Sequence, residues 1–343
     1  MNEIFRASAD VLTAKTRTAL LDAGATPETA EATTQALLYA SNIGVDSHGV
    51  RLVTHYAAML RAGRVKTNPI LKVRRTAPAT AMLDADNGLG HHASYQAMKL
   101  AIEMAGQAGI GAVGVMHSSH CGAVGAYALK AAEAGMVGIV TSNSDANVTL
   151  FNGSRTFHGT NPLAMAAPVS NQMPWLLDMA TSSIPFNRVR LYRSLGLPLP
   201  SDVAADAEGN ITQDAMRAAM LLPLGGESYG FKGAGLAGMV TILSTVLTGA
   251  VIDPLLVQMT ETSDFTTPRN VGHFCIALDP ARFIGREAFD GVLKNYLALL
   301  RAVPSTVPGE SVMAPGDREW KIAEERKRTG IPVDPDTQAF LQL

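Results

Sequence analysis

Cysteine is scarce in this chain. Cys121 and Cys275 are the two cysteines among 343 residues, and neither sits in a CxxC or other metal-ligand spacing. This scarcity excludes a disulfide framework and favours a reducing compartment. The HxxE and HExxH patterns of histidine-ligated metals are missing too, so we expect no metal site.

Excess charge of one sign is also absent. The formal net charge is −2, from 28 basic and 30 acidic residues without a block of like charge. Nucleic acids and anionic membranes attract basic surfaces, so small-molecule partners are favoured here. The first residues, Met-Asn-Glu-Ile-Phe-Arg, lack the basic and apolar segments of a signal peptide, and we expect a cytoplasmic protein.

One uncharged stretch, from Gly233 to Ile252, is twenty residues long. A membrane-spanning helix needs about that length, but such helices rely on bulkier apolar residues than the Gly, Ser and Thr found here. The sequence favours a tightly packed buried helix with Lys232 and Asp253 at its edges.

Helical signals dominate the N-terminal part of the chain. The spacing of apolar residues predicts helices from Glu3 to Ala23, from Pro27 to Ser41 with Thr26 as N-cap, and from Leu52 to Ala62. The stretch 65–76, which is rich in Pro, Lys and Arg, is interpreted as a connector.

From residue 77 onward strands and helices alternate, and the length suits roughly two domains. Helices are predicted at 91–107, at 122–133 and from 286 to the end, and strands at 81–84, 110–116, 136–141, 163–169, 175–179 and 271–278. No helix separates the strands between 136 and 180, so neighbours there should pair antiparallel. The fold class is therefore α/β with a mixed sheet.

Two glycine motifs match known patterns by letter. Gly109 to Gly114 fits GxGxxG, but a Rossmann fingerprint follows a strand and opens a helix, whereas here a helix ends and a strand begins. Gly226 to Gly230 fits the GxSxG of serine hydrolases, with Ser228 as nucleophile. The residues before it favour a strand weakly, so Ser228 is a rival catalytic hypothesis and not the preferred one.

Three histidines lie in polar motifs that interrupt apolar sequence: Val45-Asp46-Ser47-His48-Gly49-Val50-Arg51, Ser118-Ser119-His120-Cys121-Gly122 and Phe157-His158-Gly159-Thr160-Asn161-Pro162. Histidine titrates near neutral pH, so His48 can offer a proton beside the fixed charge of Arg51, and a 2-oxo acid needs both. The loop 153–162 could present N–H groups to phosphates or form a plain turn. For His48 and His120 the alternative is a buried structural histidine.

Five motifs in order resemble the type-2 malate/L-lactate dehydrogenase family over nearly the whole chain. They are Asp46 to Arg51 with Tyr56, Ser119 to Ala123, Gly159 to Pro162, Asp178 to Ser182, and Lys232-Gly233. The family also holds ureidoglycolate and sulfolactate dehydrogenases, 2,3-diketogulonate reductase and Δ1-piperideine-2-carboxylate reductase.

The resemblance implies a non-Rossmann enzyme that uses NAD or NADP and forms a homodimer. It implies a cofactor domain at 77–284 built on a largely antiparallel seven-stranded sheet, an N-terminal helical part at 1–76, and C-terminal helices at 285–343 that pack with it. His48 would be the general acid/base beside Ser47, and His120 would act near the nicotinamide. The cofactor cleft would be lined by Gly122, Ala123, Thr160, Asn161, Asp178, Met179, Ala180, Lys232, Gly233, Arg269 and Asn270.

Two departures from the family pattern concern the substrate. Relatives place an arginine four residues after the histidine, where this chain has Leu52 and carries Arg51 one position early. Relatives often carry Gly-Lys or Gly-Asp where this chain has Asn187-Arg188. We expect Arg51 to bind the carboxylate and Arg188 to face the substrate.

The function predicted from this resemblance is NAD(P)H-dependent hydride transfer to C2 of a small 2-oxo or cyclic 2-imino carboxylate, with a proton from His48. A serine hydrolase using Ser228 is one alternative. A catalytically inactive protein that still binds the cofactor is the other.

Overall fold

A seven-stranded sheet forms the centre of the computed structural model, which describes residues 5–260 and 262–343. Its strand order is β2-β3-β4-β12-β5-β8-β9. The strands are β2 (Lys72–Ala77), β3 (Thr80–Asp84), β4 (Ile110–Ser118), β5 (Val137–Ser142), β8 (Leu163–Ala167), β9 (Trp175–Met179) and β12 (Val271–Leu278). Neighbours pair antiparallel except β3 with β4. The predicted mixed, largely antiparallel sheet is confirmed.

The edge strand β2 corrects the interpretation of 65–76 as a connector. All six of its residues are exposed. Its sequence therefore lacks the alternation of apolar and polar side chains that indicates a half-buried strand. Lys72, Arg74 and Arg75 lie on this strand, and such charges discourage further pairing at an open edge.

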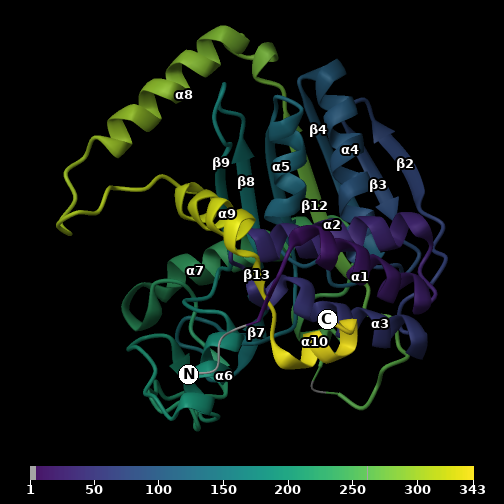
Figure 1. The fold of residues 1–343 in the computed structure, drawn as a ribbon, viewed down its shortest axis with the longest axis vertical. Coiled ribbons are helices and arrows are strands. Elements are labelled where there is room, and N and C mark those ends of the chain that lie inside the picture. Colours follow the sequence, from purple (N-terminus) through teal and green to yellow (C-terminus); the bar gives the residue numbers. More distant parts are fainter. Residues whose placement is uncertain (1–4, 261) are drawn as a thin grey trace.

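Two helices cover one face of the sheet, α4 (Gly90–Ala108) and α5 (Gly125–Glu133) (Figure 1). Small residues let them approach closely: a Cβ at Gly111 on β4 would collide with the Ala101 carbonyl of α4. Gly109 ends α4 with a φ of +85°. The glycines of the GxGxxG match therefore act as a helix C-cap and a close-packing site.

Helices from both chain ends form a second layer. They are α1 (Ala9–Asp22), α2 (Pro27–Asn42), α3 (Val53–Ala62), α9 (Asp317–Thr329) and α10 (Pro335–Leu341). Strand β1 (Arg6–Ala7) pairs with β13 (Ile331–Pro332), and a buried apolar cluster joins residues of both ends. The Thr26 side chain caps α2 as predicted, whereas α1 begins at Ala9 because Ser8 caps it; the expected start at Glu3 lies outside the described residues.

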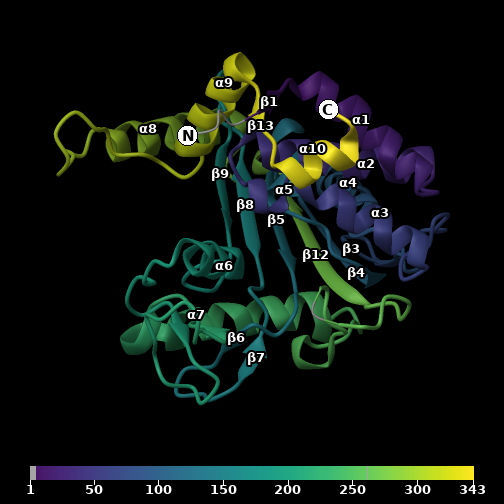
Figure 2. The same cartoon turned by 60° about the horizontal axis from the view of Figure 1, so that its bottom comes forward.

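Helix α8 (Arg286–Arg301) extends away from the body of the molecule (Figures 1 and 2), and its last residue, Arg301, forms an ion pair with Asp317 at the start of α9. Its Leu297 is buried against Val169, with Trp175 beside it. The division of the chain into 1–76, 77–284 and 285–343 stays a prediction.

A smaller lobe carries a four-stranded sheet with helices α6 and α7 beside it (Figure 2). Its elements are β6 (Val148–Thr149), β7 (Thr156–His158), β10 (Ala204–Ala205), β11 (Met220–Leu221), α6 (Phe186–Leu195) and α7 (Gly226–Thr241).

Helix α7 corrects the prediction of a buried helix at 233–252. It begins at Gly226, so Lys232 lies inside it, and a π-helical segment follows at Ile242–Val246. Gly226, Gly230, Gly233, Ala237 and Val240 are buried against the lobe, whereas Tyr229, Phe231 and Met239 are exposed. None of the helices in the described part is long and apolar enough to cross a membrane.

Candidate active site

The rings of His48 and His120 face each other at the junction of the helical layer and the sheet. Their centroids are 5.8 Å apart and the planes are inclined by 28°. His48 ends a short 3-10 turn, Asp46–His48, after α2, and His120 follows the end of β4. The fold thus brings together two motifs that are far apart in the sequence.

A neighbouring hydroxyl holds each ring at Nδ1. Ser47 Oγ lies 2.9 Å from His48 Nδ1, and Tyr56 Oη lies 2.7 Å from His120 Nδ1. Among the described residues neither Nε2 has a hydrogen-bond partner. The two Nε2 atoms are therefore available to a bound molecule.

Both histidines are held in the neutral form. Burial lowers the pKa of His48, and burial together with the nearby His48 lowers the pKa of His120 well below its ordinary value. A neutral imidazole can accept a proton at neutral pH, as a general base must.

The turn that carries His48 is fastened to the C-terminal part of the chain. Arg326 of α9 donates two hydrogen bonds, of 2.5 and 2.8 Å, to the Asp46 carboxylate. The Ser41 hydroxyl accepts the Val50 N–H at 3.0 Å, and a Cβ at Gly49 would collide with that hydroxyl. Both ends of the chain thus fix the position of His48.

Tyr56 is a site residue to which the sequence analysis gave no role. Tyr56 lies on the buried side of α3. A buried tyrosine hydroxyl needs a polar partner, and this need is the signal in the sequence that could have identified Tyr56 as a site residue. Its ring also packs edge-on against His91 at 4.7 Å. His91 is fully buried, and neither of its ring nitrogens has a hydrogen-bond partner in the described part of the chain.

Asp178 lies next to the segment that carries His120, Gly122 and Ala123. Its Oδ2 accepts the backbone N–H of Gly125 at the start of α5, at 2.9 Å. Burial raises the pKa of Asp178 to about 6, although the Gly125 N–H opposes this shift.

The residues that follow Asp178 reach the other predicted cofactor residues. Thr181 donates its N–H to the Thr160 carbonyl at 2.8 Å, and Leu224 donates to the Thr181 carbonyl at 2.9 Å. Gly233 in turn donates to the Leu224 carbonyl at 3.1 Å. The structure therefore joins Thr160, 178–181 and Lys232-Gly233 into one continuous strip, which we call the cofactor strip.

Asn161 is occupied inside the protein. Its Oδ1 accepts the Ser144 N–H at 3.2 Å, and its Nδ2 donates to Asp253 Oδ2 at 2.8 Å. Asp253 is buried and also accepts from His158 Nδ1 and from the Gly159 N–H, each at 3.2 Å. This network fixes the 158–161 loop, and no sequence pattern indicated Asp253 as its centre.

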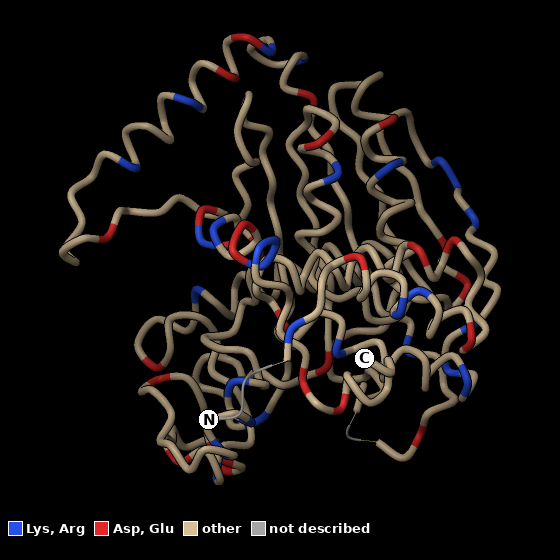
Figure 3. Tube along the Cα trace, viewed as in Figure 1, with Lys and Arg blue, Asp and Glu red and all other residues tan. Residues whose placement is uncertain are grey.

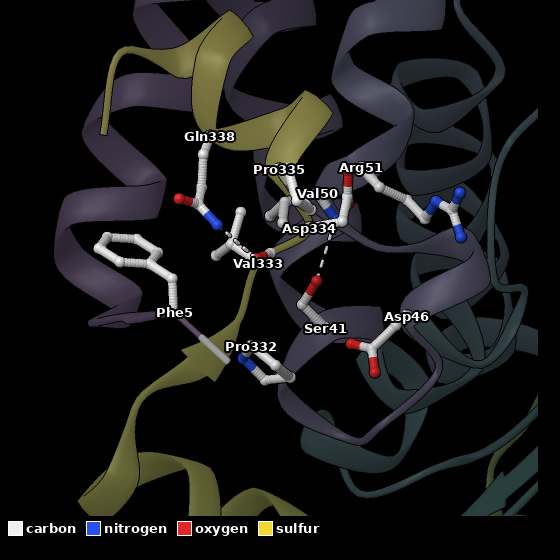
Figure 4. Close-up of a pocket in the computed structure, with 10 residues that line it drawn as sticks. All are labelled: Phe5, Ser41, Asp46, Val50, Arg51, Pro332, Val333, Asp334, Pro335 and Gln338. Atoms are coloured by element: carbon white, nitrogen blue, oxygen red, sulfur yellow. Dashed lines mark hydrogen bonds between the residues drawn. The ribbon is translucent and has the colours of Figure 1, made fainter. Parts of the chain in front are cut away.

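Several predicted residues lie away from the histidine pair or serve structural contacts. Arg51 is exposed and lines a cavity of about 600 Å³ with Asp334 and Pro335, and none of Ser47, His48 and His120 lines that cavity (Figure 4). Arg188 is exposed on α6. Asn270 accepts the His117 N–H at 2.6 Å.

Ser228 lies in the first turn of α7 and is exposed. No described residue makes a hydrogen bond to its hydroxyl, so a histidine base is missing. The described residues also contain no group of three or more His, Cys, Asp or Glu side chains that could hold a metal ion.

These features place the chain among α/β proteins with a mixed, largely antiparallel sheet and a pair of facing histidines at the junction of sheet and helical layer. Comparison identifies its family: residues 7–342 match the malate/L-lactate dehydrogenase model. The chain belongs to this family, whose members are dehydrogenases and reductases.

Relatives match over most of their length. The malate dehydrogenase of Pyrococcus horikoshii is 36% identical over 316 residues, covering 90% of this chain and 86% of the relative. Its solved structure has a TM-score of 0.88 and covers 99% of this chain and 94% of that one, at 34% identity. The ureidoglycolate dehydrogenase (NAD(+)) of Escherichia coli K12 is 32% identical, covering 94% and 90%. The (2R)-3-sulfolactate dehydrogenase (NADP(+)) of Chromohalobacter salexigens is 33% identical, covering 87% and 85%.

Proposed function

We propose that the protein transfers hydride between NAD(P) and C2 of a small 2-hydroxy or 2-oxo carboxylate, or of its cyclic 2-amino or 2-imino counterpart. The observation that carries this proposal is the His48–His120 pair, with each Nδ1 engaged and each Nε2 open. The names of the malate and sulfolactate relatives support a 2-hydroxy acid as substrate.

In this proposal His48 is the general acid/base. With its Nδ1 proton donated to Ser47 Oγ, the neutral ring keeps a lone pair on Nε2 that accepts the proton of the substrate hydroxyl. In the opposite direction the protonated ring returns that proton to the developing alkoxide or amine. Ser47 remains bound to Nδ1 throughout and keeps the ring in place.

His120 has the complementary role of a hydrogen-bond donor. Burial raises the pKa of Tyr56 well above its ordinary value, so its hydroxyl stays protonated and can donate to His120 Nδ1. The ring proton is then on Nε2, where it can stabilise negative charge on the substrate oxygen.

The cofactor strip carries hydrogen-bond donors and a positive charge that suit a dinucleotide. The Lys232 ammonium is exposed and lies over the Tyr229 ring at 5.1 Å. It forms no ion pair with any described residue, so its charge can bind a phosphate. Thr160 and the backbone of 178–181 would hold the rest of the cofactor, and Gly122, with φ of +71°, lets the chain pass close to the His91 ring. When bound, the nicotinamide supplies or accepts the hydride. Relatives are named for either cofactor, so both are tested.

We also propose a homodimer in the cytoplasm. Two helical faces support association: α8 exposes Val292, Tyr296 and Leu299, and the end of α7 with the segment after it exposes Met239, Ile242 and Val246. The scarcity of cysteine supports a reducing compartment.

The first test is the loss of nicotinamide absorbance with NADH and then NADPH against pyruvate, oxaloacetate, 2,3-diketogulonate and the two cyclic imino acids. Turnover with one acid, lost in His48→Gln and kept in Ser228→Ala, is the expected result. Ester hydrolysis that depends on Ser228 would instead establish a hydrolase, and cofactor binding without turnover would establish an inactive homologue.

A further inference from the structure

The carboxylate of the proposed substrate needs a positive partner near the histidine pair. Arg51 does not meet this need, because it is exposed in the cavity beside Asp334. Leu52 occupies the position that holds the substrate arginine in the family pattern described above. The charge must therefore come from another element of the fold.

Two buried arginines lie on the side of the molecule where α3 carries His55 and Tyr56. Arg64 follows the end of α3, and Arg269 precedes β12; they are 2% and 6% exposed. Arg269 Nε donates to the Val257 carbonyl at 2.7 Å, and Arg64 Nη1 donates to the next carbonyl, Gln258, at 3.1 Å. The two guanidinium groups are therefore close neighbours.

Their charges are balanced only in part. Arg269 forms an ion pair with Asp145. Arg64 hydrogen-bonds backbone carbonyls, among them that of Asp264, and forms no ion pair with a described residue. Within the described part of the chain the Arg64 guanidinium thus lacks a directly paired carboxylate, although the Asp264 carboxylate acts on it electrostatically. A buried guanidinium without an ion pair in contact favours an anion beside it.

This charge lies within electrostatic reach of the histidines. Burial, with Arg269 and Arg64 adding to it, lowers the pKa of His55 to about 4, and Arg269 also contributes to the lowered pKa of His120. The His55 ring packs on Tyr56 at 5.6 Å, and Tyr56 bonds His120. Asn270, which follows Arg269 in the chain, accepts the His117 N–H at 2.6 Å, so Arg269 lies close to the segment that carries His120.

Arg64 also has a hydrogen-bond donor that a ligand could use. Its Nε is buried and has no partner among the described residues. Nη2 of Arg64 already donates to the Asp264 carbonyl, but this –NH₂ group carries a second hydrogen. Nε and Nη2 together can therefore still offer two parallel hydrogen bonds to a carboxylate. We propose that Arg64, with Arg269 beside it, binds the carboxylate of the substrate; this rests on the proposed function.

Binding of a charged and a neutral probe tests the proposal without turnover. Oxamate and oxamide have nearly the same shape and differ in one carboxylate, so the ratio of their affinities, measured calorimetrically with NADH or NADPH present, reports carboxylate recognition. We expect the wild type to prefer oxamate strongly and Arg64→Gln to reduce that preference by about 10- to 100-fold. Arg64→Lys, which keeps the charge but not the two-pronged edge, should give an intermediate ratio.

Matched variants separate recognition from loop damage. Arg64 also stacks on Phe265 at 5.5 Å, so Phe265→Leu disturbs the same loop while keeping the charge, and the oxamate preference should survive it. Arg51→Gln should keep it as well. A preference that survives Arg64→Gln, one that is lost in Arg51→Gln, or a wild type that does not distinguish the probes would overturn the proposal. Arg64-dependent oxamate binding in a protein without turnover would instead refute the proposed function alone.

Discussion

His48 and His120 differ from solvent histidines because burial removes water that would stabilise their charged forms. For a base, a lowered pKa means that the neutral, proton-accepting form persists to lower pH. The hydroxyls of Ser47 and Tyr56 fix the two rings without supplying charge. In the proposed function, this state favours oxidation of an alcohol at neutral and mildly acidic pH.

The pH profile of alcohol oxidation follows from this state. We expect kcat/KM with the 2-hydroxy acid to stay level from pH 7.5 to below pH 6.5, the ordinary value for histidine, and to fall only at lower pH as His48 becomes protonated. His48→Gln should reduce kcat by about 10²- to 10⁴-fold and remove the acidic limb. A limb near pH 6.5 or above that persists in His48→Gln would assign the base to another group.

The 158–161 loop depends on one side chain, Asp253, that is distant from it in the sequence. Asp253 accepts from the Asn161 amide, His158, the Gly159 N–H and Thr241, and it is 1% exposed. A carboxylate can satisfy all these donors because it has only acceptor sites.

Asp253→Asn places an amide N–H₂ among these donors. We expect it to lower the free energy of unfolding, measured by urea titration, by about 2–4 kcal/mol, because a buried donor is left facing donors. Asp10→Asn, at an exposed position of α1, is the matched control and should change stability by less than about 0.5 kcal/mol. A loss below about 1 kcal/mol in Asp253→Asn would mean that the loop does not rely on this network.

The same dependence on distance explains what the sequence could predict. The strands β4, β5 and β12 are strongly apolar, and the Thr26 cap of α2 is local, so their patterns are readable. Strand β2 exists because its backbone pairs with β3, although its side chains bury nothing. The sequence motifs indicated His48 and His120. They could not indicate Asp253 and Arg64, because hydrogen-bond partners of these residues lie about 90 and 200 residues away in the chain.

At the scale of the whole molecule, buried neutral histidines make the fold sensitive to acid. Burial lowers the pKa of His55 to about 4, of His91 to about 3 and of His273 to about 4. The unfolded chain binds these protons at about pH 6.5, so the stability from keeping the rings neutral is present above that pH and is lost as pH falls toward 4. Asp178, with its pKa raised to about 6, acts in the opposite direction and offsets part of the loss.

We therefore expect the free energy of unfolding to be at least about 3 kcal/mol lower at pH 5 than at pH 7. Urea titration at the two pH values measures it. His91→Gln removes one of the three groups and should reduce the difference by about 2 kcal/mol. Equal stability at both pH values would show that these rings are hydrated or paired in the folded protein.

The shape of the molecule leaves one helix without enough neighbours. Helix α8 extends from the body (Figures 1 and 2). In the described part of the chain, the apolar cluster on its buried side is small and includes Val169, Trp175 and Ala314. Its other side exposes Val292, Tyr296 and Leu299, which follow one another at helical spacing. Charged residues are spread over both lobes (Figure 3), so an apolar helix face is the feature best suited to bind a second copy.

The proposed homodimer can be tested on that face. We expect light scattering to give twice the chain mass for the wild type and the mass of one chain for Val292→Asp combined with Leu299→Asp, because burying two carboxylates against apolar side chains is strongly unfavourable. Ile70→Asp is the control, since Ile70 is 65% exposed and lies outside α8, and it should stay dimeric. A monomeric wild type would refute the homodimer. A dimeric double variant would move the interface from α8 to the other apolar face, at Met239, Ile242 and Val246.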